Sequence, residues 1–348
     1  MKTTLRALGG NLLISVFSLR RTVGVLVSGM LIFYSASIWA STCIGAAEPA
    51  WKPTKPIKII ASLGPGSNVD TQARLIGAEV GRLLGVSVVV DNKPGGGGRI
   101  AINELLKAAP DGHTFMLNLA SMTTVPQLYK KVPYDLFNDF TPLTTASLGG
   151  TVLVTRADSD YKTLDDVVRF AKANPGKLTI ASYGMGTTSH LNIETLKSLL
   201  KTDIGHVPYA GGATPANVDL IGGRIDLYFD GPATAITNLK AGKVRILAAA
   251  TERRIPAIPE VATFRELGFD LGIDGWLGFF GPAQMPCQVV QTLYNAIVLA
   301  EQSEQFKRVV LDAGLDQGGE SPEAFTMRIK NDYLRWGKVI RESAISLD

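Results

Sequence analysis

Residues 57–84 read IKIIASLGPGSNVDTQARLIGAEVGRLL, and the fold class can be argued outward from them. Ile57–Ser62 is mostly apolar, with Lys58 as its one charged residue, as is typical of a strand that is largely buried on both faces. A loop rich in glycine and proline follows it. From Val69 to Leu84 the apolar residues then recur at helical spacing. These residues therefore predict a strand, a tight loop and an amphipathic helix.

The same alternation continues along the chain. Further strands are expected at Ser87–Asp91, Thr114–Leu119, Val152–Thr155, Leu178–Ser182, Ile204–Pro208, Ile225–Phe229 and Val244–Ala250. Helices are expected between them at Ile100–Ala108, Leu164–Ala173, Ser189–Leu200, Ala216–Ile221 and Pro232–Ala241, and after them at Gln288–Ser303, Gln305–Ala313 and Pro322–Glu342. Alternating strands and helices predict an α/β fold with parallel sheets that are covered on both faces.

The N-terminal segment resembles an export signal. Four basic residues precede or begin an apolar run, Val23–Trp39, and no acidic residue occurs before Glu48. Gly45 and Ala47 then stand at positions −3 and −1 of a cleavage site for small residues. The alternative is a permanent membrane anchor, because the run is about long enough to cross a bilayer once. We expect residues 1–47 to be a cleaved signal peptide and the mature protein to be periplasmic.

Charge and composition exclude several classes of function. The chain has 35 Lys and Arg against 31 Asp and Glu, and four of the basic residues lie in the signal segment. The mature part therefore carries 31 of each, and this balance predicts no nucleic-acid partner. Two cysteines cannot form a thiolate-rich metal site, and His113, His190 and His206 stand far apart in the sequence without metal-ligand spacing. No nucleotide-binding glycine motif occurs, so we expect no metal and no cofactor.

A mature chain of this length is expected to fold as two lobes. Phe140–Ser147 is predicted to lead out of the first lobe, and Gly275–Phe280 is predicted to return to it. We therefore place one lobe at 48–148 plus 275–348 and the other at 149–274. Two such crossings make a hinge, and a ligand cleft is expected between the lobes.

The first loop has the composition of an anion site. It contains Pro65, Gly66, Ser67, Asn68 and Asp70, directly before the helix that begins near Val69. Serine, asparagine and aspartate cap helix starts, and the first-turn N–H groups of a helix attract carboxylate or phosphate oxygens. The alternative is a capped turn with no ligand.

Later loops repeat this arrangement. Thr187, Thr188 and Ser189 precede a helix, and two further glycine-rich turns follow Tyr209 and Asp230. The carboxyl ends of strands in open α/β sheets are where ligands bind. Together the loops predict a cleft that holds a small anion.

A hydrolase is the competing hypothesis. Ser189 and His190 are neighbours in the sequence, and a serine beside a histidine suggests a nucleophile and its base. Adjacent helical residues point in different directions, however, and no G-x-S-x-G motif is present. We therefore expect no catalytic residue and no enzyme activity.

At these loops the sequence resembles the Bug/TctC family, the extracytoplasmic solute receptors of tripartite tricarboxylate transporters. The resemblance rests on ordered motifs that cover nearly all of the mature chain. They include WKPTKPIKII at 51–60, VVVDNKPG at 88–95, AAPDGHT at 108–114, GTTSHL at 186–191 and HVPY at 206–209.

The resemblance implies a type II periplasmic-binding-protein fold, with two α/β lobes joined by a hinge. It also implies that a small di- or tricarboxylate or aromatic acid is bound and delivered to an integral-membrane permease by a monomeric receptor. A sensory protein of the same fold that signals to a membrane partner is the alternative. Carried onto this chain, the carboxylate contacts and the further cleft positions are Pro65, Gly66, Ser67, Asn68, Asp70, Ser121, Ser182, Thr187, Thr188, Ser189, Tyr209 and Asp230.

The chain departs from the family pattern at a few positions. Ser62 and Leu63 replace the usual Pro-Phe, Asn68 replaces a small residue, and Arg99 replaces asparagine. Trp276 is expected to pack at the hinge. The identity of the acid therefore stays open at this point.

Overall fold

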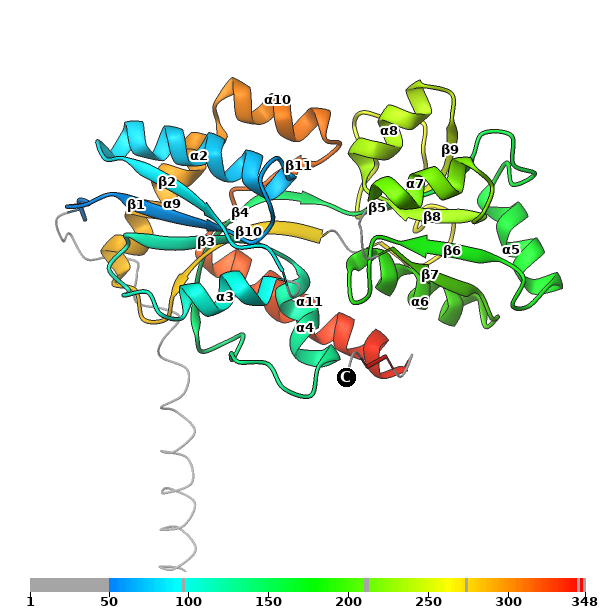
Figure 1. The fold of residues 1–348 in the computed structure, drawn as a ribbon, viewed down its shortest axis with the longest axis horizontal. Helices are drawn as coiled ribbons and strands as arrows, with labels where there is room; N and C mark the ends of the chain where they lie inside the picture. The colour runs from blue at the N-terminus through cyan, green and yellow to red at the C-terminus, as the bar shows by residue number, and fades with distance from the viewer. Residues whose placement is uncertain (1–49, 96–97, 210–212, 273–274, 343–344, 347–348) are drawn as a thin grey trace, which may run out of the picture. The chain divides into compact units, whose positions relative to one another are not determined.

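The computed structural model describes residues 50–95, 98–209, 213–272, 275–342 and 345–346 (Figure 1). The predicted signal peptide, residues 1–47, lies outside these ranges. Within them, no helix has both the length and the apolar character needed to span a membrane.

Strands and helices alternate through most of the chain. The strands are β1 (Ile57–Ala61), β2 (Val88–Asn92), β3 (Thr114–Leu119), β4 (Phe140–Gly149), β5 (Thr151–Arg156), β6 (Thr179–Ser182), β7 (Gly205–Pro208), β8 (Leu227–Asp230), β9 (Val244–Ala250), β10 (Gly275–Pro282) and β11 (Asp316–Gln317). The helices are α2 (Asn68–Leu84), α3 (Arg99–Leu105), α4 (Ser121–Leu128), α5 (Leu164–Ala173), α6 (Thr188–Leu200), α7 (Ala213–Ile221), α8 (Pro232–Lys240), α9 (Cys287–Glu301), α10 (Glu304–Asp312) and α11 (Pro322–Glu342). Every predicted strand is present, so the α/β class predicted from the periodicity is confirmed.

The strands form two separate sheets. The six-stranded sheet has the order β11-β4-β10-β3-β1-β2, and the five-stranded sheet has the order β7-β6-β8-β5-β9. The chain leaves the first sheet through β4 and enters the second through β5, with Gly150 between them. It returns through β10, whose first residue, Gly275, pairs with Gly149, the last residue of β4.

Both sheets are mixed, and the expectation of parallel sheets was wrong in this respect. The helix-connected strands β1, β2 and β3 do pair in parallel, as do β6, β7 and β8. However, β10 runs antiparallel to both β3 and β4, and β5 runs antiparallel to β8 and β9. The reason is the crossing itself. Because β10 begins beside the residue where β4 ends, it must run in the opposite direction to β4.

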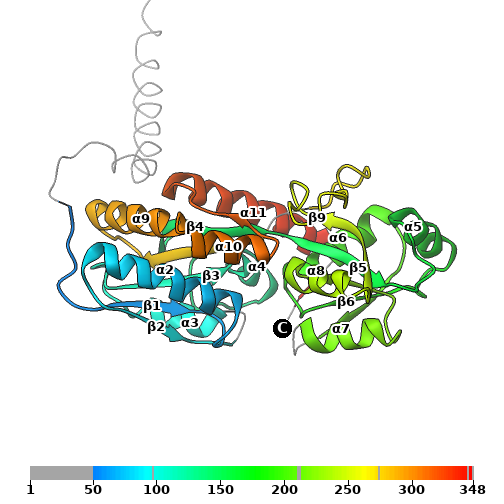
Figure 2. The same cartoon turned by 90° about the horizontal axis from the view of Figure 1, so that it is seen from above.

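Side chains alternate between the two faces of the six-stranded sheet. Ile59 packs with α2, α9 and α10 on one face, whereas its neighbour Ile60 packs with α3, α4 and α11 on the other. Figure 1 and Figure 2 show these helices as layers on either side of the strands. Burial on both faces explains why the strands are almost wholly apolar.

The five-stranded sheet is covered in the same way. Leu153 packs with α5 and α6, and Val152 and Val154 pack with α7 and α8. A further small cluster brings together Leu128 of α4, Leu191 of α6 and Trp336 of α11. Helices from both parts of the chain therefore share buried contacts beside the crossing strands.

Helix α4 is an element that the sequence pattern did not predict. It contains Pro126 and begins with Ser121, Met122, Thr123 and Thr124, so that it lacks the polar and apolar alternation of a typical amphipathic helix. Its buried residues come from nearly every position, including the threonines. A helix that is buried on most sides leaves no periodic signal.

Candidate functional site

A cavity of about 740 Å³ is lined by elements that belong to both sheets. Its wall includes α4, the end of β4 and the start of β10 on one side, and the starts of α6 and α8 on the other. This is the size range of pockets that enclose small organic molecules. Among the described residues that line it, none carries a charged side chain.

The start of α6 faces this cavity. Gly186, with a φ of +74°, lets the chain turn into the helix, and Thr187 caps it. The Thr187 hydroxyl donates to the carbonyl of Gly184 at 2.7 Å and accepts from the N–H of His190. No acidic residue lies in the first turn of α6. The positive end of the helix dipole is therefore not offset by an acid within its own first turn.

Tyr183 lies against the same helix start. Burial raises the pKa of Tyr183 to about 12, although the N–H of Ser189 and the hydroxyl of Thr188 lower it. Tyr183, Thr187 and Thr188 all line the cavity. Because the Thr187 hydroxyl already donates to Gly184, a ligand oxygen at this point would meet the hydroxyls of Tyr183 and Thr188 as well as the helix dipole.

Helices α4 and α6 meet at the cavity. The hydroxyl of Thr124 on α4 donates to the carbonyl of Gly186, just before α6, at 3.3 Å. Ser121, at the start of α4, also lines the cavity. The first turn of α4 contains no acidic residue either. Two helix starts without acids are thus joined by a hydrogen bond.

The start of α2 is different, because it already holds a carboxylate. Asp70 is buried, and its carboxylate accepts from the N–H of Gly66 at 2.9 Å and pairs with Arg74 at 2.9 Å. Burial raises the pKa of Asp70, but Arg74 and the Gly66 N–H more than offset this and hold the pKa below its usual value. Ser67 caps the helix by accepting from the N–H of Asp70. Of this loop, Leu63 and Asn68 line the cavity.

The start of α8 also holds an acid. Asp230 is fully buried, and its carboxylate accepts from the N–H of Gly231, the hydroxyl of Thr234 and the amide of Asn217. Burial raises the pKa of Asp230, while these donors act in the opposite direction. Gly231 and Thr234 line the cavity, whereas Asp230 lies behind them.

The structure brings four of the predicted site residues into the cavity wall: Asn68, Ser121, Thr187 and Thr188. The remaining eight are not among the residues that line it: Pro65, Gly66, Ser67, Asp70, Ser182, Ser189, Tyr209 and Asp230. Which of the twelve contact a ligand stays a prediction.

Four of the eight use their hydroxyls within the protein: Ser67 accepts from the N–H of Asp70, and the other three bond to groups farther along the chain. Ser189 donates to the carbonyl of Phe229 at 2.7 Å, Ser182 lies 2.7 Å from Nε2 of His206, and Tyr209 donates to Asp219 at 2.7 Å. These bonds hold the loops that shape the cavity.

The structure also places Trp276 and Arg99, whose location relative to the cavity the sequence did not show. Trp276 lines the cavity and is buried, and its indole Nε1 donates to Asp332. Arg99 is not among the lining residues. Its guanidinium carbon lies 4.3 Å from the ring centre of Tyr129, which does line the cavity. Trp276 thus packs in the core beside the crossing strands and also forms part of the cavity wall, and a role at a hinge stays a prediction.

Comparison with known proteins decides the family. The family model described as "Tripartite tricarboxylate transporter family receptor" matches residues 72–345. The chain belongs to this receptor family. A UPF0065 protein from the tcbD-tcbE intergenic region of Pseudomonas sp. (strain P51) is 35% identical over 295 residues, which cover 83% of this chain and 87% of the relative.

Solved structures of similar proteins support the fold of the receptor. One described as a periplasmic transporter is 35% identical, with a TM-score of 0.74 over 85% of this chain and 99% of its own. An R. palustris protein solved with adipate is 28% identical, with a TM-score of 0.75 over 84% of this chain and 99% of its own. The receptor therefore has the fold of periplasmic solute-binding proteins.

Two histidines of the receptor that are distant in sequence lie together. The rings of His190 and His206 stack with centres 4.3 Å apart and planes 13° apart. Together with Glu194 their ligand atoms lie within 4.8 Å of one another. Their separation in the sequence did not indicate this contact. Sequence periodicity did not show it, because the contact joins α6 to the neighbouring strand β7.

This cluster fits a metal ion poorly. Burial lowers the pKa of both His190 and His206 to about 4, so both rings are neutral at neutral pH, as metal ligation would also require. The N–H of Gly186 donates to Nδ1 of His190 at 3.0 Å, which places the ring proton on Nε2. A metal would need the lone pair of that nitrogen. The stacked rings of the receptor are better explained as support for the α6 loop.

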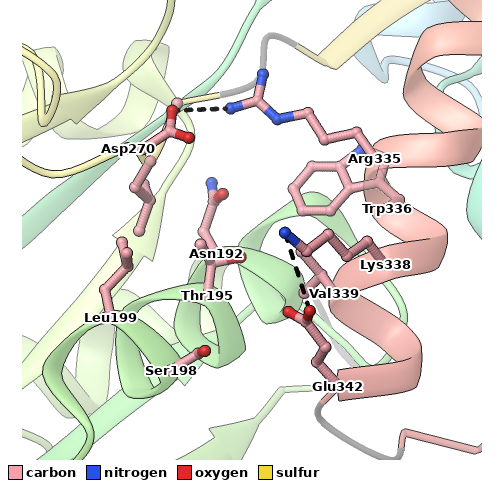
Figure 3. Close-up of a pocket in the computed structure, with 12 residues that line it drawn as sticks. Asn192, Thr195, Ser198, Leu199, Asp270, Arg335, Trp336, Lys338, Val339 and Glu342 are labelled. Atoms are coloured by element: carbon pink, nitrogen blue, oxygen red, sulfur yellow. Dashed lines mark ion pairs between the residues drawn. The ribbon is translucent and has the colours of Figure 1, made fainter.

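A second, smaller cavity of about 210 Å³ lies between α6 and α11 of the receptor. Figure 3 shows Asp270 facing Arg335, and Lys338 facing Glu342, at 3.5 Å and 3.9 Å. The charges of this cavity are paired with one another. It differs in this respect from the large cavity, whose lining side chains are uncharged.

Proposed function

We propose that the protein captures a small organic carboxylate in the large cavity and passes it to an integral-membrane permease. The observation that carries this proposal is the uncharged cavity onto which the acid-free starts of α4 and α6 open. Dipoles and hydroxyls can hold a carboxylate reversibly, since no full ion pair must be broken for release. The R. palustris relative solved with adipate supports a carboxylate as the ligand class.

The proposal includes a hinge. Residues 48–148 plus 275–348 would form one lobe around the six-stranded sheet, and residues 149–274 the other. The paired glycines Gly149 and Gly275 at the crossing support these boundaries. A ligand that contacts both lobes would favour the closed arrangement by its differential contacts.

Export completes the proposal. Residues 1–47 would direct the chain to the periplasm and be removed there, leaving a monomer that begins near Glu48. N-terminal sequencing and light scattering of protein recovered from a periplasmic extract would test both points. A retained N-terminus in the membrane fraction would favour a permanent anchor instead.

The binding test is calorimetry on that protein with a panel of organic acids. We expect at least one acid to bind and to raise the melting temperature, because a ligand that binds the folded state stabilises it. The variant Thr188→Val keeps the shape of the side chain and removes a hydroxyl from the cavity wall. It should weaken binding while the fold is retained. A broad panel with no binding at millimolar concentrations would reject the receptor function.

A further inference from the structure

The cavity wall has little with which to neutralise a ligand that carries several charges. Among the described lining residues none has a charged side chain, and much of the surface is apolar. Leu119, Val125, Leu128, Leu148 and Trp276 contribute to it. A carboxylate that is moved from water to such a surface without charge-assisted donors is strongly disfavoured. The number of carboxylates that fit therefore depends on the helix starts.

Two of the helix starts at the cavity already hold an acid of the protein itself. Asp70 accepts an N–H at the start of α2, and Asp230 accepts an N–H and a hydroxyl at the start of α8. Each of these carboxylates uses local donors; the charge of Asp70 is paired with Arg74, and Asp230, when ionised, also repels a ligand anion nearby. Neither end therefore offers the ligand a strong anion position.

Of the other helix starts at the cavity, which include that of the short helix α3 at Gly98, those of α4 and α6 converge on one place. The first turns of α4 and α6 contain no acid, and Thr124 donates from α4 to the carbonyl of Gly186 at the start of α6. Ser121, Thr187 and Thr188 surround this junction with hydroxyls. The polar groups thus favour one carboxylate at one place.

Asn68 adds one more polar group to the wall. Its amide oxygen accepts from Gln72 at 2.8 Å, so its NH₂ group can donate to a ligand. A single neutral amide can bind a hydroxyl or carbonyl of a ligand. It cannot offset a second full charge in the way that an ion pair does.

We propose that the ligand is a monocarboxylate with a sizeable apolar body. Its carboxylate lies at the junction of α4 and α6, and its body lies against Val125, Leu148 and Trp276. This inference rests on the proposed receptor function and narrows it: a second carboxylate at the far end of the ligand weakens binding. The receptor would then differ from its R. palustris relative solved with adipate.

The test uses pairs of acids that differ by one carboxylate. Calorimetry compares hexanoate with adipate, benzoate with terephthalate, and 2-naphthoate with naphthalene-2,6-dicarboxylate, on protein purified from the periplasm after expression of the full chain. We expect the monoacid of at least one pair to bind at least tenfold more tightly than its diacid. Diacids that bind as tightly as the monoacids, or more tightly, overturn this inference and leave the receptor function standing. If no acid of these pairs or of a broad panel binds, both fail.

Substitutions of residues in the cavity wall provide the second part of the test. Leu148→Thr adds a hydroxyl to the apolar side and suits a strand, so it should weaken monoacid binding about tenfold and narrow the gap to the diacid. Val89→Thr is the matched control, because Val89 is 57% exposed on β2 and does not line the cavity. Equal effects of the two variants would overturn the assignment of the apolar side. If the wild type prefers diacids and Arg99→Gln abolishes that preference, the inference is overturned. Arg99 would then be assigned as the group that binds a second carboxylate.

Discussion

The indole N–H of Trp276 donates a 2.7 Å hydrogen bond to the carboxylate of Asp332, and both side chains are buried. Trp276 stands at the start of β10, where the chain returns to the six-stranded sheet, and Asp332 lies on α11. Because Trp276 also lines the large cavity, this bond connects the cavity wall with the C-terminal helix. Burial raises the pKa of Asp332 to about 6, although Trp276, Arg328 and Arg335 lower it.

Asp332→Asn should remove a pH dependence of stability. The folded pKa of about 6 lies above the ordinary value of 3.8 for an aspartate, so the native state holds the proton more tightly and stability falls as the pH rises through this window. Relative to the variant, the wild type should lose about 2 kcal/mol of unfolding free energy between pH 4.5 and pH 7.5. Urea unfolding at several pH values measures this. Parallel curves for the two proteins would contradict the raised pKa.

Trp276→Phe provides the companion measurement. It removes the donor and keeps an aromatic ring, so the pKa of Asp332 should rise further and the fall in stability should extend to higher pH. The acid Glu252 acts in the same direction, and Arg328 acts against it. If Asp332 already carries the substitution to Asn, the change at Trp276 should have no effect on the pH profile.

Glu301 should give a second and larger pH effect. Its side chain is fully buried at the end of α9, and neither of its carboxylate oxygens has a hydrogen-bond partner among the described residues. Burial raises its pKa to about 9. Between its ordinary pKa near 4.5 and pH 9, folding requires proton uptake, so stability should fall by about 1.4 kcal/mol per pH unit.

Glu301→Gln is the variant that isolates this effect. It keeps the shape and removes the titration, so it should be more stable than the wild type at pH 8 and similar to it at pH 4. Chemical unfolding at the two pH values makes the comparison. The exposed Glu323→Gln on α11 is the control and should change neither curve. A wild type that is equally stable at both pH values, relative to Glu301→Gln, would show that the carboxyl is solvated.

The sheets and most helices could be predicted because their signals are local. Ile57–Ala61 is apolar except for Lys58, and Thr163 begins a helix with the capping box that Asp166 completes. The direction of β10 could not be predicted in this way, since it depends on pairing Gly275 with Gly149, more than a hundred residues away. The hydrogen bond between Trp276 and Asp332 likewise joins residues that are distant in the sequence, so it could not be predicted from local signals.

The loops that form the candidate site could be predicted from the sequence better than the individual side chains that line it. The sequence located the loops that lead into α2 and α6, because capping residues and glycines are local features, and the structure places the helix caps at Ser67 and Thr187. The sequence could not show which hydroxyls the protein would use itself. Ser67 caps its own helix and Ser189 bonds to a strand carbonyl, while Thr188 lines the cavity. These residues are similar in type, and only the packing of distant segments determines which hydroxyls are used within the protein and which face the cavity.

Gly150→Ala should disturb the crossing between the sheets. A Cβ at Gly150 would lie 2.0 Å from the carbonyl oxygen of Ala250, which is backbone and cannot rotate away. We expect a loss of more than about 2 kcal/mol of unfolding free energy. Gly64→Ala is the control, because a Cβ there meets nothing within 4 Å, and it should be neutral or slightly stabilising. Equal melting temperatures for the two variants would argue against this tight contact.

Ser189→Ala separates the receptor hypothesis from the hydrolase alternative. Because the Ser189 hydroxyl is buried and donates to Phe229, and because Nδ1 of His190 accepts from Gly186, the two side chains do not form a nucleophile and base pair. We therefore expect the variant to lose about 1 kcal/mol of stability, through one lost hydrogen bond, and to bind the acid within threefold of the wild type.

The neighbouring Thr188→Val should show the opposite pattern, with nearly unchanged stability and weaker binding, because Thr188 lines the cavity. Calorimetry measures how tightly each variant binds the acid, and urea unfolding measures the stability of each variant. The hydrolysis of nitrophenyl esters by the wild type and both variants is the third measurement. Turnover by the wild type that Ser189→Ala abolishes would support an enzyme. Loss of acid binding in Ser189→Ala without turnover would instead make its hydroxyl a ligand contact that forms only when the acid is bound.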